Sequence, residues 1–177
     1  MGHLLFFFFS AERDGCSPDA CHAKCNNLSP LLVIASNTAG YVFGGYARYP
    51  RTDSGTVYIC DPSAFLFRLK KANQRDCMKF LARNDNLCTV VSSFADQGPL
   101  FGNTSGKAAL KFFSGEVTKQ AGKPFFVCSN LSVNFANGFQ NNGQDNNALT
   151  GGNNQLLNIE VYHVEGMYID KGKLILM

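Results

Sequence analysis

The chain has 177 residues, of which 45% are hydrophobic, and this length fits one domain that is able to bury a core. Only 16% of the residues are charged, and the net charge is +3 with Lys and Arg scattered along the chain. These features argue against a nucleic-acid partner, which requires a basic patch or stripe.

The chain opens with an apolar run, Leu4 to Phe9, after Met-Gly-His. A secretory signal needs roughly 7–15 apolar residues, a basic flank before them and a small-residue cleavage site. The run is short and only His3 precedes it, so we favour a buried strand over a truncated signal. No stretch approaches the ~20 apolar residues of a membrane span, and none is expected.

Ser17-Pro18-Asp19 predicts a helix start, with a Ser N-cap, Pro in the first helical position and an acid in the first turn. The helix is expected to run to about Cys25. Residues 31–35 are a β-type run, residues 37–40 read as a turn, and residues 40–46 form an aromatic, glycine-bearing strand. The pattern predicts a β-hairpin.

Further β-type runs follow, separated by turn signals. They are residues 56–60, 64–69, 88–94, 108–113, 124–128 and 156–164. Residues 70–76 are polar, residues 97–102 read as a turn, and residues 137–155 form an Asn/Gln/Gly-rich stretch that predicts a mobile surface loop. Many short strands with turn signals predict a sandwich that carries one or two helices.

Five segments in order resemble a TLDc domain. The opening is Glu12-Arg13-Asp14-Gly15, then the helix with His22 and Cys25, then the strand 40–46. The later blocks are residues 61–69, 98–102, 132–140 and 159–162. The resemblance covers about residues 4–164 and implies a single domain over 1–177. It implies an α+β, mostly β fold: two antiparallel sheets packed as a sandwich, flanked by short helices.

The best-known TLDc proteins resist oxidative stress or bind the proton-pumping vacuolar ATPase, with no established enzyme chemistry. The resemblance therefore implies a cytoplasmic, non-catalytic module that binds a protein partner or regulates it, without a cofactor. No Gly-x-Ser-x-Gly pattern or phosphate loop is present, and the histidines are only His3, His22 and His163. The sequence thus singles out no catalytic residue.

Seven cysteines are present, an odd number, with no C-x-x-C spacing. A secreted protein would pair up to six of them, whereas a cytosolic one would keep all seven reduced. Cys16, Cys21, His22 and Cys25 invite a zinc hypothesis, but at helical period His22 points about 100° away from Cys21. We expect buried packing thiols there and no metal site.

The Asn/Gln-rich stretch supplies candidate binding residues, because amide side chains offer paired donors and acceptors that suit sugar hydroxyls. The candidates are Asn134, Gln140, Asn141 and Asp145. Glu160 is either an exposed strand carboxylate or a contact with a partner. Scarce charge, many amides and seven cysteines favour an extracellular protein, so the alternative function is a secreted, oligomeric, lectin-like carbohydrate-binding protein.

Overall fold

The computed structural model describes residues 4–48, 57–83, 90–93, 98–104, 107–113, 125–126 and 138–165. The helices there are α1 (Ala11–Asp14) and α2 (Pro18–Cys25). The strands are β1 (Leu4–Ser10), β2 (Leu31–Asn37), β3 (Val42–Ala47), β4 (Val57–Cys60), β5 (Phe65–Lys71), β6 (Gln74–Leu81), β7 (Val90–Ser93), β8 (Leu100–Thr104), β9 (Lys107–Lys111), β10 (Phe125–Phe126) and β11 (Gln155–Glu165). None of the described helices is long and apolar enough to cross a membrane.

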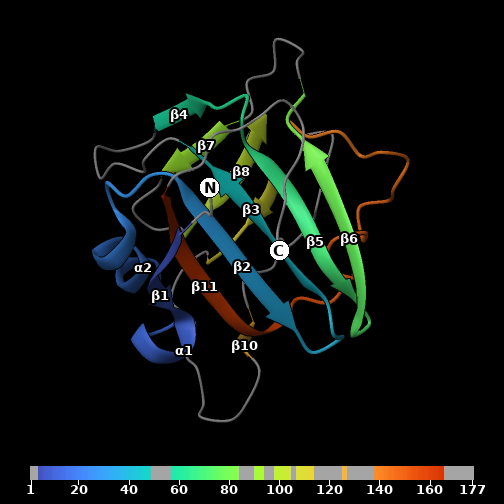
Figure 1. Ribbon diagram of the computed structural model, residues 1–177, viewed down its shortest axis with the longest axis horizontal. Helices are drawn as coiled ribbons and strands as arrows, with labels where there is room; N and C mark the ends of the chain where they lie inside the picture. The colour runs from blue at the N-terminus through green and yellow to red at the C-terminus, as the bar shows by residue number, and fades with distance from the viewer. Residues whose placement is uncertain are drawn as a thin grey trace.

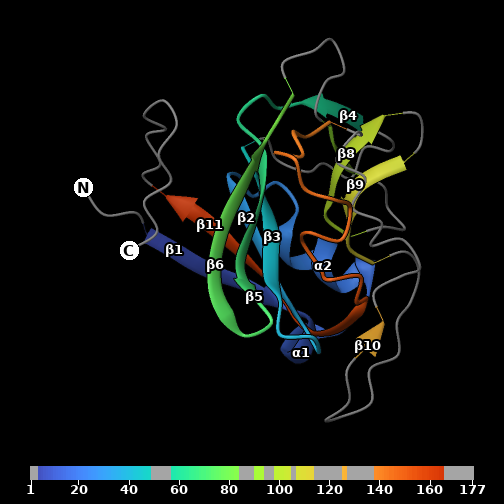
Figure 2. The same ribbon diagram turned by 90° about the vertical axis from the view of Figure 1, so that its right-hand side faces the viewer.

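The described strands form two antiparallel sheets (Figures 1 and 2). The larger has the order β1-β11-β2-β3-β5-β6, with β10 also paired to β11, and the smaller has the order β4-β7-β8-β9. The helices lie beside β1 and β11 (Figure 1). The predicted class, a mostly β fold of two antiparallel sheets with short helices, is confirmed.

The inner face of the larger sheet packs on the smaller one through a shared apolar core. Phe9, Phe43, Leu66 and Val161 from the larger sheet are fully buried in the same cluster as Phe101 from β8. A second, smaller cluster lies on the outer face. It contains Leu32, Tyr46, Phe65, Phe67 and Val164. Since residues alternate between the faces of a strand, both faces of the larger sheet bury apolar side chains.

The predicted helix start at Ser17 is confirmed, since the Ser17 side chain accepts from the Ala20 N–H at 3.1 Å and α2 begins at Pro18. The predicted hairpin is also confirmed, because β2 and β3 pair in antiparallel register from Leu31↔Ala47 to Ser36↔Val42. The capping residues and the strand–turn–strand pattern thus predicted α2 and the β2–β3 hairpin correctly.

The apolar run at the N-terminus is a strand, as expected, but it is not buried throughout. Phe9 is fully buried, whereas Leu4, Leu5, Phe6 and Phe7 are 62, 47, 42 and 44% exposed. The expectation of a buried strand is wrong for these four residues, because β1 lies at the edge of the sheet (Figure 1). Hydrophobicity alone does not report whether a neighbouring element covers a strand.

The strands β6 and β8 are not among those that the sequence predicts. β6 begins with polar residues that face solvent, and Phe80 is its only fully buried residue, so it carries no clear alternation. β8 lies within and after a stretch that reads as a turn because of Gly98, Pro99 and Gly102. Leu100 and Phe101 are nevertheless buried in the core.

The Asn/Gln-rich stretch is described from residue 138 onward, and it is not a solvated surface loop throughout. Ala148, Leu149 and Thr150 are buried, the last two almost completely. The buried side chain of Asn37 holds this region by donating to Thr150 O at 2.8 Å and to Asn153 O at 3.0 Å. The surface expectation is therefore wrong at residues 148–150, and mobility stays a prediction.

Candidate functional site

The predicted binding residues that the structure describes do not come together in one site. Asn134 lies outside the described residues. Gln140 is exposed, and its main-chain N–H pairs with Leu81 O at 2.9 Å. The side-chain oxygens of Asn141 and Asp145 each close a turn, by accepting from the N–H of Gly143 at 3.3 Å and of Asn147 at 2.9 Å. These side chains shape the segment, and only Asp145 also faces a pocket.

Glu160 lies on β11, and it is half-buried rather than fully exposed. Its carboxylate accepts from the Tyr162 hydroxyl at 2.7 Å and from Asn158 Nδ2 at 3.2 Å. Burial, helped by the hydrogen bond to Glu160, raises the pKa of Tyr162 to about 12. Glu160 therefore has local structural partners, and its contact with another protein stays a prediction.

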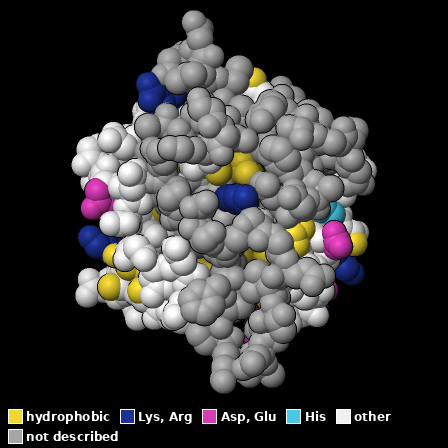
Figure 3. All heavy atoms as spheres, turned by 180° about the vertical axis from the view of Figure 1, so that it is seen from behind, with side chains coloured by type: hydrophobic (Ala, Val, Ile, Leu, Met, Phe, Trp, Pro, Cys, Tyr) yellow, Lys and Arg dark blue, Asp and Glu magenta, His cyan; other side chains and the backbone are white. Residues whose placement is uncertain are grey.

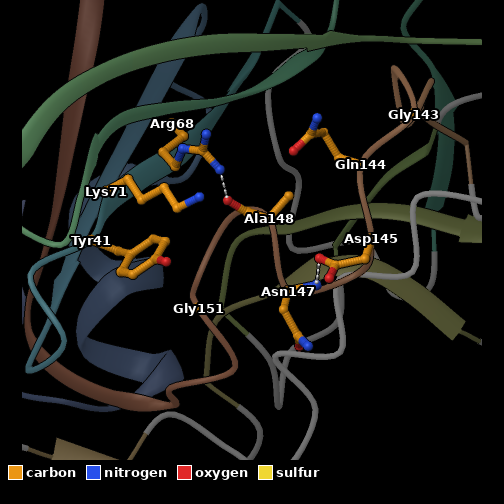
Figure 4. Close-up of a pocket in the computed structure, with 9 residues that line it drawn as sticks. All are labelled: Tyr41, Arg68, Lys71, Gly143, Gln144, Asp145, Asn147, Ala148 and Gly151. Carbon is orange, nitrogen blue, oxygen red and sulfur yellow. Dashed lines mark hydrogen bonds between the residues drawn. The ribbon is translucent and has the colours of Figure 1, made fainter.

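A pocket of about 420 Å³ lies between β5, the turn before β3 and residues 143–151 (Figure 4). We call it the β5 pocket. Its lining residues are Tyr41, Arg68, Lys71, Gly143, Gln144, Asp145, Asn147, Ala148 and Gly151. Of these, the sequence analysis names only Asp145. Five others belong to the same Asn/Gln-rich stretch, whereas Tyr41, Arg68 and Lys71 come from separate parts of the chain.

Arg68 forms the buried part of this pocket wall, with 3% of its side chain exposed. Its Nη2 donates to Asp76 Oδ2 at 2.6 Å, and its Nη1 donates to the main-chain oxygen of Ala148. The Nε of Arg68 is buried without a hydrogen-bond partner. Arg68 thus joins β5 to the Asn/Gln-rich segment, and a charged residue within an apolar strand was the available sequence signal.

Lys71 lies on the same wall as Arg68, although residues three apart on a regular strand face opposite sides. In the pairing of β5 with β3, Phe43 faces Arg68 and Val42 faces Lys70, so β5 has one extra residue at this point, and such a bulge turns the following side chains to the other face. Sequence alternation cannot reveal this irregularity. Within the described part of the chain, Lys71 makes no ion pair.

Tyr41 lies beside Lys71 in the lining of the β5 pocket (Figure 4). Its ring packs on the backbone of Gly151, where an added Cβ would lie 2.6 Å from the ring. Gly151 also has a φ of +64°, which favours glycine. The close approach of Tyr41 therefore depends on glycine at this position.

A second candidate surface is the stretch of Leu4, Leu5, Phe6 and Phe7 on β1, which we call the apolar edge. Figure 2 shows β1 and the end of β11 extending beyond the smaller sheet. Among the described strands, β1 pairs only with β11. The Phe7 ring lies 5.4 Å from the Tyr162 ring, centroid to centroid. The Arg13 guanidinium lies over the Phe7 ring, 4.5 Å from its centroid.

The described histidines have structural partners. His22 Nδ1 lies 2.9 Å from Asn26 Oδ1, and His163 Nδ1 lies 3.2 Å from Pro30 O. In the described ranges, no three His, Cys, Asp or Glu side chains are grouped to hold a metal ion. The charged side chains that are coloured in Figure 3 lie scattered and form no basic patch on that face.

Cys16, Cys21 and Cys25 are buried in the core cluster, which confirms the prediction that they pack there. Cys60 and Cys77 are both exposed. Cys88 and Cys128 lie outside the described residues.

Comparison with known proteins supports the resemblance found in the sequence. The model of the TLDc domain family matches residues 3–165, which is nearly the whole chain. No curated protein matches the chain. TLDc domains are in general non-catalytic modules. The fold, the ordered blocks and the extent of this match agree, and the chain belongs to the TLDc domain family.

Proposed function

We propose that the chain is a non-catalytic protein-binding module that holds its partner along β1. The apolar edge carries this proposal, because four successive large apolar side chains there are 42–62% exposed. Single exposed apolar residues are common on soluble proteins, whereas a group of them along one strand, here with Leu5 and Phe7 on the same face, is typical of an interaction surface.

The position of the apolar edge at the border of a sheet gives it a second means of binding. Edge strands carry main-chain N–H and C=O groups that can pair with an added strand. Proteins usually protect such edges with charged residues or Pro, and residues 4–9 contain neither. A partner that adds a strand beside β1 would gain main-chain hydrogen bonds together with apolar contacts.

The apolar contacts supply useful binding free energy. Full burial of an exposed Leu or Phe side chain contributes ~1.5–3 kcal/mol, so a half-buried one contributes about 1 kcal/mol when a partner covers it. Replacing two of these side chains by Lys removes both contacts and places charge in the interface. The vacuolar ATPase, a partner implied by the family resemblance, is the first complex to test.

The test compares Leu5→Lys/Phe7→Lys with the control Leu81→Lys, a residue on the opposite edge strand that is 45% exposed. We expect the wild type and the control to bind the purified peripheral sector of the vacuolar ATPase with the same Kd. The double variant should bind at least about 100-fold more weakly, the factor expected for about 3 kcal/mol. Biolayer interferometry measures the Kd, and urea unfolding checks that each variant is folded.

If this complex does not bind the wild type, a photo-reactive benzophenone amino acid in place of Phe6 identifies the partner from cell extract. The matched control carries the same group in place of Leu81. Labelling of one protein from position 6 and not from position 81 supports the proposal. Equal labelling from both positions, or none, contradicts it.

A further inference from the structure

We propose that the β5 pocket binds a small organic anion that also carries hydroxyl groups, such as a phosphate monoester or a carboxylate of a polyol. Its volume of about 420 Å³ lies in the range of roughly 300–1,000 Å³ that small-molecule sites occupy. In the larger sheet, β11, β2 and β3 separate β5 from β1. The pocket is thus a different site from the apolar edge.

The anion is assigned to the wall formed by Arg68 and Lys71. The charge of Arg68 is offset by Asp76, 2.6 Å away, whereas no described carboxylate offsets Lys71. Lys71 is exposed, so its ammonium group can reach a ligand without a large desolvation cost. Hydrogen bonds between ammonium and carboxylate or phosphate groups are charge-assisted, and they are among the stronger polar contacts.

This wall also has hydrogen-bonding capacity that the protein does not use. Arg68 Nε is a buried donor without a partner, which is uncommon in folded proteins. Because Nη1 and Nη2 are held by Ala148 O and Asp76, the guanidinium is fixed in place before any ligand arrives. A preorganised positive wall loses little conformational entropy on binding.

The facing wall is suited to hydroxyl groups. Figure 4 shows the side chain of Gln144 lying opposite Arg68, with Asp145 and Asn147 beyond it on the same segment. Asp145 Oδ1 accepts from the Asn147 N–H, which leaves Oδ2 as an acceptor. Among the described residues, the Gln144 and Asn147 amides make no side-chain hydrogen bond.

The two walls together orient the ligand. A carboxylate at Asp145 repels a second anion and accepts from a hydroxyl, while amides both donate to and accept from hydroxyls. The anionic group therefore lies toward Lys71 and the hydroxyl groups toward Gln144, Asp145 and Asn147. A neutral polyol lacks the first contact, and a simple inorganic anion lacks the second.

The test titrates the full chain with glycerol 3-phosphate and with gluconate, and with inorganic phosphate and glycerol as the two comparison probes. Chemical shifts of the Gln144 and Asn147 side-chain amides report binding at this site. We expect saturable shifts with glycerol 3-phosphate or gluconate, with a Kd at least about tenfold lower than for inorganic phosphate or glycerol, the factor of one lost polar contact.

The decisive variant is Lys71→Met, and its matched control is Lys70→Met, which removes the same charge from a neighbouring exposed residue that does not line the pocket. Lys71→Met should raise the Kd at least about tenfold, and Lys70→Met less than about twofold. Gln144→Ala should also weaken binding. This variant keeps the hydrogen bond from the main-chain N–H of residue 144 to Asn141 O.

Several outcomes would overturn the proposal. They are no saturable shift with either hydroxylated anion, equal affinity for glycerol and glycerol 3-phosphate, or equal losses in Lys71→Met and Lys70→Met. The last outcome would indicate long-range attraction to net charge and not a built site. None of these outcomes bears on the apolar edge, whose variants leave the β5 pocket intact.

Discussion

At the scale of the residue, single buried polar side chains decide where the Asn/Gln-rich segment lies. Asn37 is 1% exposed, and its amide donates to two main-chain carbonyls, Thr150 O and Asn153 O. Its Oδ1 accepts from the Tyr41 N–H at 3.0 Å. Asn37 is therefore fully paired, and it holds the segment and the turn before β3 together.

We predict that Asn37→Ala lowers the free energy of unfolding by about 3 kcal/mol, because it removes three hydrogen bonds, to Thr150 O, to Asn153 O and from the Tyr41 N–H, each worth about 1 kcal/mol. Asn141→Ala is the control, since it removes one exposed side-chain bond, to the Gly143 N–H, and should cost less than about 1 kcal/mol. Urea unfolding measures both values. Similar losses in the two variants would show that the Asn37 bonds do not stabilise the fold.

At the scale of the element, the contact between β3 and β8 sets how the two sheets pack. A Cβ at Gly45 would lie 2.6–2.8 Å from three ring carbons of Phe101, which is closer than side chains can approach. The ring of Phe101 thus fills the space that the missing side chain leaves. Glycine at position 45 reflects close packing and not a turn.

We predict that Gly45→Ala destabilises the protein by about 2–3 kcal/mol, because the added methyl group displaces the Phe101 ring. In the Phe101→Leu background the same change should cost less than half as much, since the ring atoms are gone. A double-mutant cycle of unfolding free energies measures this coupling. Equal costs in both backgrounds would mean that the methyl group clashes elsewhere.

At the scale of the whole molecule, the distribution of thiols between core and surface is open to direct measurement. Cys16, Cys21 and Cys25 are 5, 0 and 1% exposed, and Cys60 and Cys77 are exposed. Because reaction of a thiol requires access as well as ionisation, the two groups should differ widely in reactivity.

We predict that, in a variant with Cys88 and Cys128 changed to Ser, two thiols react rapidly with a disulfide reagent under native conditions. The three buried thiols should react only on unfolding, and the total in denaturant should be five without added reductant. Absorbance of the released thiolate measures the count. A total below five would indicate disulfides, and it would favour the secreted interpretation that the composition left open.

The sequence by itself determined the family, the fold class, the α2 start and the β2–β3 hairpin. These depend on capping residues, turn residues and alternation, which are signals carried by neighbours in the chain. It also indicated that Cys16, Cys21 and Cys25 pack in the core. It predicted binding residues in the Asn/Gln-rich segment, and of these only Asp145 lines the β5 pocket.

Only the tertiary structure decided that Leu4–Phe7 remain exposed and that Arg68, Lys71 and Tyr41 meet residues 143–151 in a pocket. Exposure of β1 depends on its place at the sheet edge, which is a long-range pairing that no local pattern encodes. The shared wall of Arg68 and Lys71 depends on a bulge in β5 opposite β3, which interrupts the regular alternation of side chains between the two faces of the strand. Both candidate sites therefore arise from strand order and register, which leave β1 at the edge of the sheet and bring distant segments of the chain together in the β5 pocket.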